Sequence, residues 1–237
     1  MNMLSLIQHF CSRTNLSVPQ TVYGTSDKQA RQILALLEEE GADLSARGEW
    51  EVLTNEKTHT TLAQEDQGAM TAIASNGFRY IKNDTIWDRN LQEPVYGGIS
   101  GREWQALKAT AVTGPKYQFR IRGGHLLANP VPVAGHVWAF EYISENWITD
   151  LNGGNPKQFF TSDTDLMLLP NNLLLMGLRW RFKKEEGLEY AEDFRTYEMQ
   201  VKDALSRDGA KRKLNMGCID GGKSPNVFIP AGSWALP

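Results

Sequence analysis

The sequence predicts an α+β protein, in which an antiparallel β-rich domain is inserted into a helical, bundle-like domain and an extended tail follows. Three observations support this prediction. Apolar residues recur at helical spacing in the first and last thirds of the folded part, apolar and polar residues alternate between them, and Gly and Pro interrupt every period in the final segment. We expect a discontinuous helical domain at 1–48 and 165–209, an inserted β-rich domain at 49–164 and a C-terminal tail at 210–237.

The first helical region is predicted to contain two helices. Residues 3–10 form a short apolar segment of helical character. The next helix is predicted to start at Ser26, because Ser26 and Gln29 match a capping box, in which side chain and backbone satisfy each other's unpaired groups. Its apolar face consists of Ala30, Ile33, Leu34, Leu37 and Leu44. Because Leu44 continues this face, we expect the helix to pass Gly41 and end near Gly48.

The middle of the chain has the period of β-strands. The strand-like runs, which are rich in β-branched residues or alternate apolar and polar side chains, are residues 58–61, 78–81, 117–121 and 137–143. Asn-Gly, Gly-Gly and Asn-Pro pairs separate them and predict turns. One helix is expected among these strands, starting at Ser100, where Glu103 completes a second capping box.

The helical period returns after Asp165. Pro170 suits the first turn of a helix, because its missing N–H would have no partner there, and Gly187 is expected to end this helix. A last helix, ending near Gly209, has one apolar stripe that consists of Tyr190, Phe194, Tyr197, Val201 and Leu205.

Composition indicates a soluble, folded protein. The 237 residues are 41% hydrophobic and 22% charged, and the net charge of −3 lacks the strongly basic character of many nucleic-acid-binding proteins. Cys11 and Cys218 lie at opposite ends of the chain and do not suggest a disulfide framework. The first residues do not resemble a signal peptide, and no apolar run reaches the roughly 18 residues of a membrane span. We therefore expect synthesis in a reducing cytoplasm and no membrane partner.

Two charged runs have structural interpretations. Glu38, Glu39 and Glu40 are interpreted as a solvated helix face. Residues 179–182 (RWRF) mix cations with aromatic rings and could contact nucleic acid. On a helix these four side chains point in different directions, so packing and salt bridges are the preferred interpretation.

The strongest chemical motif is a match to the phosphate-binding P-loop at residues 217–224 (GCIDGGKS). A working P-loop follows a buried strand and opens a helix whose N-terminal amides hold phosphate. Here Pro225 follows at once, and the 13 residues after Ser224 include Pro230. A flexible glycine-rich stretch is therefore preferred over a nucleotide-binding enzyme, which is kept as an alternative.

Other candidate sites have weaker patterns. Asp163 and Asp165 could bind a divalent cation, but hard cations need several more oxygen ligands. The four histidines, His9, His59, His125 and His136, are isolated and do not match a zinc motif, and the sequence lacks the nucleophile elbow of many serine hydrolases. The sequence thus predicts a non-catalytic protein without catalytic residues, cofactor or metal ion.

The final segment combines glycines and prolines with apolar anchors. Its predicted docking residues are Lys211, Arg212, Lys213, Val227, Phe228, Ile229, Trp234 and Leu236. Disordered linkers are normally poor in large apolar residues, so we expect this tail to become ordered on a partner. From Arg207 onward the chain holds five basic and two acidic residues, a local charge of +3.

Several short motifs resemble one protein family. They are residues 86–89, 94–105, 119–123, 130–132, 139–144 with Trp147, 177–181 and 187–191. On these motifs, which span about residues 26–205, the chain resembles the head-to-tail adaptors of short-tailed bacteriophages, also called connector or tail tubular proteins.

The resemblance implies a structural virion protein at the head-tail junction. Members of this family have a helical domain with a β-rich insertion, and they form dodecameric rings between the portal vertex and the tail nozzle, with DNA passing through the central channel. The resemblance implies that residues 211–237 dock on the portal protein, and that the β-rich insertion meets the nozzle or tail fibres during viral assembly and DNA ejection.

A ligand-binding β-sandwich is a further alternative. Trp138, Tyr142 and Trp147 could form an aromatic platform, for example for carbohydrate. Alternation places residues 138, 140 and 142 on one face of their strand, but core packing explains that face equally well.

Overall fold

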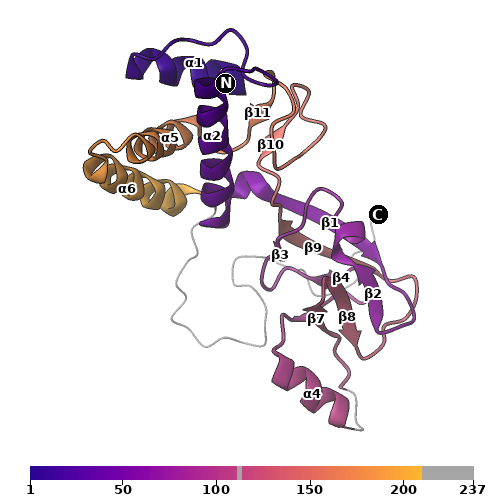
Figure 1. Cartoon of the computed structure of the whole chain (residues 1–237). Helices are drawn as coiled ribbons and strands as arrows, with labels where there is room; N and C mark the ends of the chain where they lie inside the picture. The colour runs from indigo at the N-terminus through magenta and orange to yellow at the C-terminus, as the bar shows by residue number, and fades with distance from the viewer. Residues whose placement is uncertain (111–113, 210–237) are drawn as a thin grey trace, which may run out of the picture.

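The computed structural model describes residues 1–110 and 114–209 and shows a mixed α+β fold with largely antiparallel sheets (Figure 1). The predicted tail lies outside the described residues. The helices are α1 (Met3–Thr14), α2 (Lys28–Ala46), α3 (Met70–Ile73), α4 (Gly101–Ala109), α5 (Asn171–Glu185), α6 (Ala191–Arg207) and a short 3-10 helix, η1 (Glu51–Leu53). The strands are β1 (Thr54–Thr60), β2 (Asp66–Ala69), β3 (Tyr80–Ile81), β4 (Trp87–Asp88), β5 (Glu93–Pro94), β6 (Tyr96–Gly97), β7 (Gln118–Arg122), β8 (His125–Asn129), β9 (Val137–Ile143), β10 (Ile148–Thr149) and β11 (Leu166–Met167).

Strand β9 organises the largest sheet. It pairs antiparallel with β1 along its whole length, from Thr54 opposite Ile143 to Thr60 opposite Val137. On its other edge it pairs with β3 and β4, and β4 continues to β5. A second sheet has the order β2-β8-β7-β6, in which only the short β6–β7 pair is parallel, and β10 and β11 form a separate antiparallel pair.

The N-terminal helices confirm the predicted segments but correct one helix start. Helix α2 begins at Lys28, and the Asp27 side chain accepts a hydrogen bond from the Gln29 amide at 3.1 Å, so the predicted Ser26 capping box does not form. Asp is as good an N-cap as Ser, and here it lies one residue closer to the helix. The helix continues past Gly41, as expected. Glycine fits at this position because the Trp147 indole occupies the space that a Cβ would need.

Among the other elements, the capping box of α4 is confirmed. The Ser100 hydroxyl accepts from the Glu103 amide at 3.3 Å, and the Glu103 carboxylate accepts from the Ser100 amide at 2.8 Å. The strand expected at 78–81 is shorter than predicted and covers only β3. Pro170 takes the N-cap position of α5 rather than its first turn, and Gly187, at φ +70°, follows the helix end as expected.

Buried apolar residues gather in two clusters. The first joins α1, α2, α5 and α6 with Trp50, Trp147 and Phe160, so it combines both ends of the described chain. The second lies between the two larger sheets and includes Ile86, Trp138 and Phe140. Figure 1 shows α1, α2, α5 and α6 at one end of the molecule and β2, β7, β8 and α4 at the other. None of the helices in the described residues is both long and apolar enough to cross a bilayer.

Candidate functional site

A buried carboxylate joins three helices of the first cluster. Glu40 on α2 is 0% exposed, so its interpretation as part of a solvated face was wrong, whereas the Glu39 side chain is 62% exposed. Arg181 on α5 donates from Nε to Glu40 Oε2 at 2.7 Å, and the Tyr197 hydroxyl on α6 donates to Glu40 Oε1. Gly177 makes room for this group, because a Cβ there would overlap the Glu40 carboxyl carbon. The sequence contained a signal, since Glu40 lies on the same stripe as Ile33, Leu37 and Leu44.

The electrostatics of this network reflect its burial. Burial raises the pKa of Glu40, and the hydrogen bonds from Arg181 and Tyr197 oppose that rise. Burial and the Glu40 charge also raise the pKa of Tyr197. Arg181 reaches Asp43 at 3.0 Å and Glu39 as well, and stacks on the Trp180 ring at 4.7 Å. The preferred interpretation of residues 179–182, packing and salt bridges, is therefore confirmed for Trp180 and Arg181.

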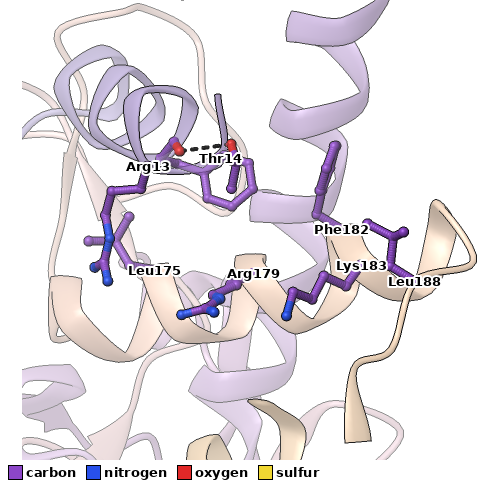
Figure 2. Close-up of a pocket in the computed structure, with 8 residues that line it drawn as sticks. Arg13, Thr14, Leu175, Arg179, Phe182, Lys183 and Leu188 are labelled. Carbon is purple, nitrogen blue, oxygen red and sulfur yellow. Dashed lines mark hydrogen bonds between the residues drawn. The ribbon is translucent and has the colours of Figure 1, made fainter. Parts of the chain in front are cut away.

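A pocket of about 420 Å³ lies between the C-terminal parts of α1 and α5 (Figure 2). It is lined by Phe10, Arg13, Thr14, Leu175, Arg179, Phe182, Lys183 and Leu188. Phe10 and Phe182 meet edge to face, with ring centroids 5.5 Å apart, and form an apolar base. The Thr14 hydroxyl donates to the Phe10 carbonyl at 2.9 Å and is thereby occupied.

Positive charge surrounds this apolar base. Arg13 approaches from α1, and Arg179 and Lys183 approach from α5 (Figure 2). Asp193 on α6 pairs with Arg179 at 3.3 Å and with Lys183, whereas Arg13 has no ion-pair partner among the described residues. The eight lining residues do not include a carboxylate, His or Cys to act as acid, base or nucleophile. The chemistry therefore suits binding of an apolar group with nearby negative charge.

The predicted acidic pair before α5 has structural roles. Asp163 accepts from the amides of Val22 and Tyr23 at 3.1 and 2.8 Å. Buried Asp165 accepts from Lys157 Nζ at 2.8 Å and from two backbone amides of its own turn. These carboxylates thus fasten the N-terminal loop and the turn before α5. Within the described ranges no group of three or more His, Cys, Asp or Glu side chains is arranged to hold a metal ion.

A second buried carboxylate organises the β-rich part. Asp88 accepts from the Trp138 indole at 3.1 Å and from the amides of Asn90 and Leu91 at 2.9 and 3.0 Å, and it pairs with His136 Nδ1 at 2.9 Å. Burial would raise the pKa of Asp88, but these hydrogen bonds outweigh burial and lower it. Asp88 therefore links the motif at 86–89 to the strand that carries the motif at 139–144.

The other candidate residues fall into two groups. The docking residues Lys211, Arg212, Lys213, Val227, Phe228, Ile229, Trp234 and Leu236, and the P-loop match at 217–224, lie outside the described residues. The aromatic platform of the β-sandwich alternative is wrong, because Trp138, Tyr142 and Trp147 are all buried. They also divide between the two apolar clusters, so they could not form one exposed surface.

Comparisons with known proteins do not add a relative. No protein-family model matches the chain, and no curated protein matches it significantly.

Proposed function

We propose that this chain is a non-catalytic head-to-tail adaptor of a short-tailed bacteriophage, a structural virion protein that forms a ring between the portal vertex and the tail nozzle. One observation carries the proposal. Helices from both ends of the described chain share one apolar cluster, and the intervening segment has its own cluster. This agrees with the helical domain and β-rich insertion that the sequence resemblance implies.

In this proposal the helical domain is discontinuous, at 1–48 and 165–209, and the β-rich domain at 49–164 is inserted into it. Some residues of the inserted range pack into the helical domain, because their buried side chains belong to its apolar cluster. They include Trp50, Leu53, Trp147, Ile148 and Phe160. Each copy contributes one such wedge to the ring, and ring closure buries the flanks of neighbouring wedges.

Function in this proposal follows from geometry and burial. Twelve copies surround the DNA channel, and the net charge of −3 per chain suits a conduit, because a strongly basic lining would hold DNA electrostatically. The tail at 210–237 docks on the portal, where ordering costs entropy and is favourable only if its anchors find pockets. The inserted domain meets the nozzle or the tail fibres.

The test is electron microscopy and co-sedimentation of the purified protein with the portal protein of the same virus. We expect a ring on the portal, which is lost on deletion from Lys211 onward and in Trp234→Ala. Trp87→Ala is the matched control, because Trp87 is an exposed tryptophan of the inserted domain. Normal portal binding by the truncated protein would contradict the proposed role of the tail. The absence of any ring would contradict the adaptor proposal itself.

A further inference from the structure

We infer that the pocket between α1 and α5 receives the loop at 150–159 of a second copy of this chain, so that neighbouring copies meet head to tail. This inference rests on the proposed ring and names the contact that closes it. The pocket is the receiving surface, and Leu151 and Phe159 are the inserted side chains.

The pocket has the size and lining for an apolar side chain. An apolar cavity of about 150 Å³ accommodates benzene, and this pocket is larger, at about 420 Å³. Phe10, Leu175, Phe182 and Leu188 line it, and Leu188 is 55% exposed at its rim. An inserted ring would rest on the Phe10–Phe182 base and cover the exposed Leu188 side chain.

The loop at 150–159 presents the most exposed large apolar side chains of the described chain. Phe159 is 64% exposed and Leu151 is 61% exposed. The loop is held in shape, because Asp150 accepts from the Gly154 amide at 2.8 Å and from the Asn155 side chain at 2.7 Å. A loop that is already ordered loses less entropy when it binds.

The charges of the two surfaces are complementary. Arg13, Arg179 and Lys183 surround the pocket, and Asp193 offsets only part of their charge. Within the loop, hydrogen bonds from the Gly154 amide and the Asn155 side chain lower the pKa of Asp150, so it stays ionised. Glu38 lies next to Phe159, since its carboxylate accepts from the Phe160 amide at 3.1 Å.

The basic residue of the loop does not weaken this charge complementarity. Lys157 is the basic residue within 150–159, and its Nζ lies 2.8 Å from the buried Asp165 carboxylate. The chain's own tail is a poorer occupant of the pocket, because residues from Arg207 onward carry a net charge of +3.

The loop at 150–159 of the same copy lies across α2 from the far end of α5, which carries Phe182 and Lys183 of the pocket. Helix α5 starts beside β11 and runs away from it, and its 15 residues make it about 22 Å long. Figure 1 shows the β10–β11 pair and the far end of α5 on opposite sides of α2. A head-to-tail ring uses two different, complementary surfaces of each subunit and forms when the rotation between neighbouring copies closes.

Sedimentation velocity of two variants and their mixture tests this contact. Phe159→Ser damages the loop but leaves the pocket intact, and Arg13→Glu damages the pocket but leaves the loop intact. Each variant alone should associate roughly 30-fold or more weakly than the wild type. Phe159→Ser removes the inserted anchor, and Arg13→Glu places a like charge opposite the acidic groups of the loop. Mixed together they should form dimers but no larger species, because only one intact pocket and one intact loop remain to pair.

Matched controls and contrary results complete the test. Met199→Ser removes an apolar side chain that is 59% exposed on α6, and Arg102→Glu reverses an exposed charge on α4; both should associate like the wild type. Wild-type protein that stays monomeric at every concentration, or variants that associate normally, would overturn the inference. A ring on the portal with unchanged variants would overturn this contact alone, whereas head-to-tail association without portal binding would contradict the adaptor proposal instead.

Discussion

Replacing Glu40 with Gln should destabilise the protein by about 2 kcal/mol, because it leaves buried Arg181 without its central charged partner. A hydrogen bond to a charged group contributes about 1.5–3 kcal/mol, and a neutral one about 0.5–1.5 kcal/mol. The Glu40 carboxylate accepts one bond from Arg181 and one from Tyr197. Gln can accept only one of them well, because its amide group would face a donor with the other.

Two features of the network limit the size of this loss. The loss should not reach the roughly 3–5 kcal/mol measured when a buried ion pair loses one partner completely, because Arg181 also contacts Glu39 and Asp43. Part of the loss is recovered, because burial already raises the pKa of Glu40 and its charge is costly there. Urea denaturation followed by tryptophan fluorescence measures the result, since Trp180 stacks on Arg181.

Glu39→Gln is the matched control. Glu39 is the neighbouring residue on the same helix and contacts the same arginine, but its side chain is 62% exposed. An exposed ion pair contributes roughly 0–1 kcal/mol, so this variant should unfold nearly like the wild type. Equal losses in the two variants would refute the reasoning, since burial would then not decide the strength of the interaction.

Two further predictions concern the same kind of buried contact. Gly177→Ala should cost roughly 1–3 kcal/mol by overpacking, because its Cβ would overlap the Glu40 carboxyl, and the Glu40→Ala background should relieve most of that cost in urea denaturation. Asp88→Asn should cost about 2 kcal/mol at pH 7, whereas exposed Asp84→Asn should cost little. The pKa of Asp88 is lowered by folding, so its contribution is complete above the unfolded pKa of about 3.9 and disappears as pH falls through the folded value. The two stability curves should converge there, and a constant gap at low pH would contradict the ionised state of Asp88.

The order of the elements could be predicted from local patterns. The helix at α2, the strand at β9 and the capping box at Ser100 were all predicted, because each depends on residues that are close in sequence. Where a competing residue lay within one position, the prediction missed, as at Asp27. Local periodicity decides which residues form an element and determines its ends less well.

The candidate site could not be predicted in the same way. The helical stripe that Glu40 shares with Leu37 and Leu44 places it on the core side of α2. Only the tertiary structure shows that Gly177 makes room for its carboxylate and that Arg181 pairs with it. The pocket joins residues 10–14 to residues 175–188, which no local pattern relates.

By itself the sequence determined the mixed α+β composition and most of the element order, because hydrogen bonding and apolar periodicity along the chain depend on neighbours. Only the tertiary structure decided which polar groups are buried, because burial depends on contacts between segments far apart in sequence. Glu40 and Arg181 are 141 positions apart and meet at 2.7 Å. In the same way, Trp138, Tyr142 and Trp147 are buried in the cores and do not form a binding platform, because the sheets and helices that cover them come from elsewhere in the chain.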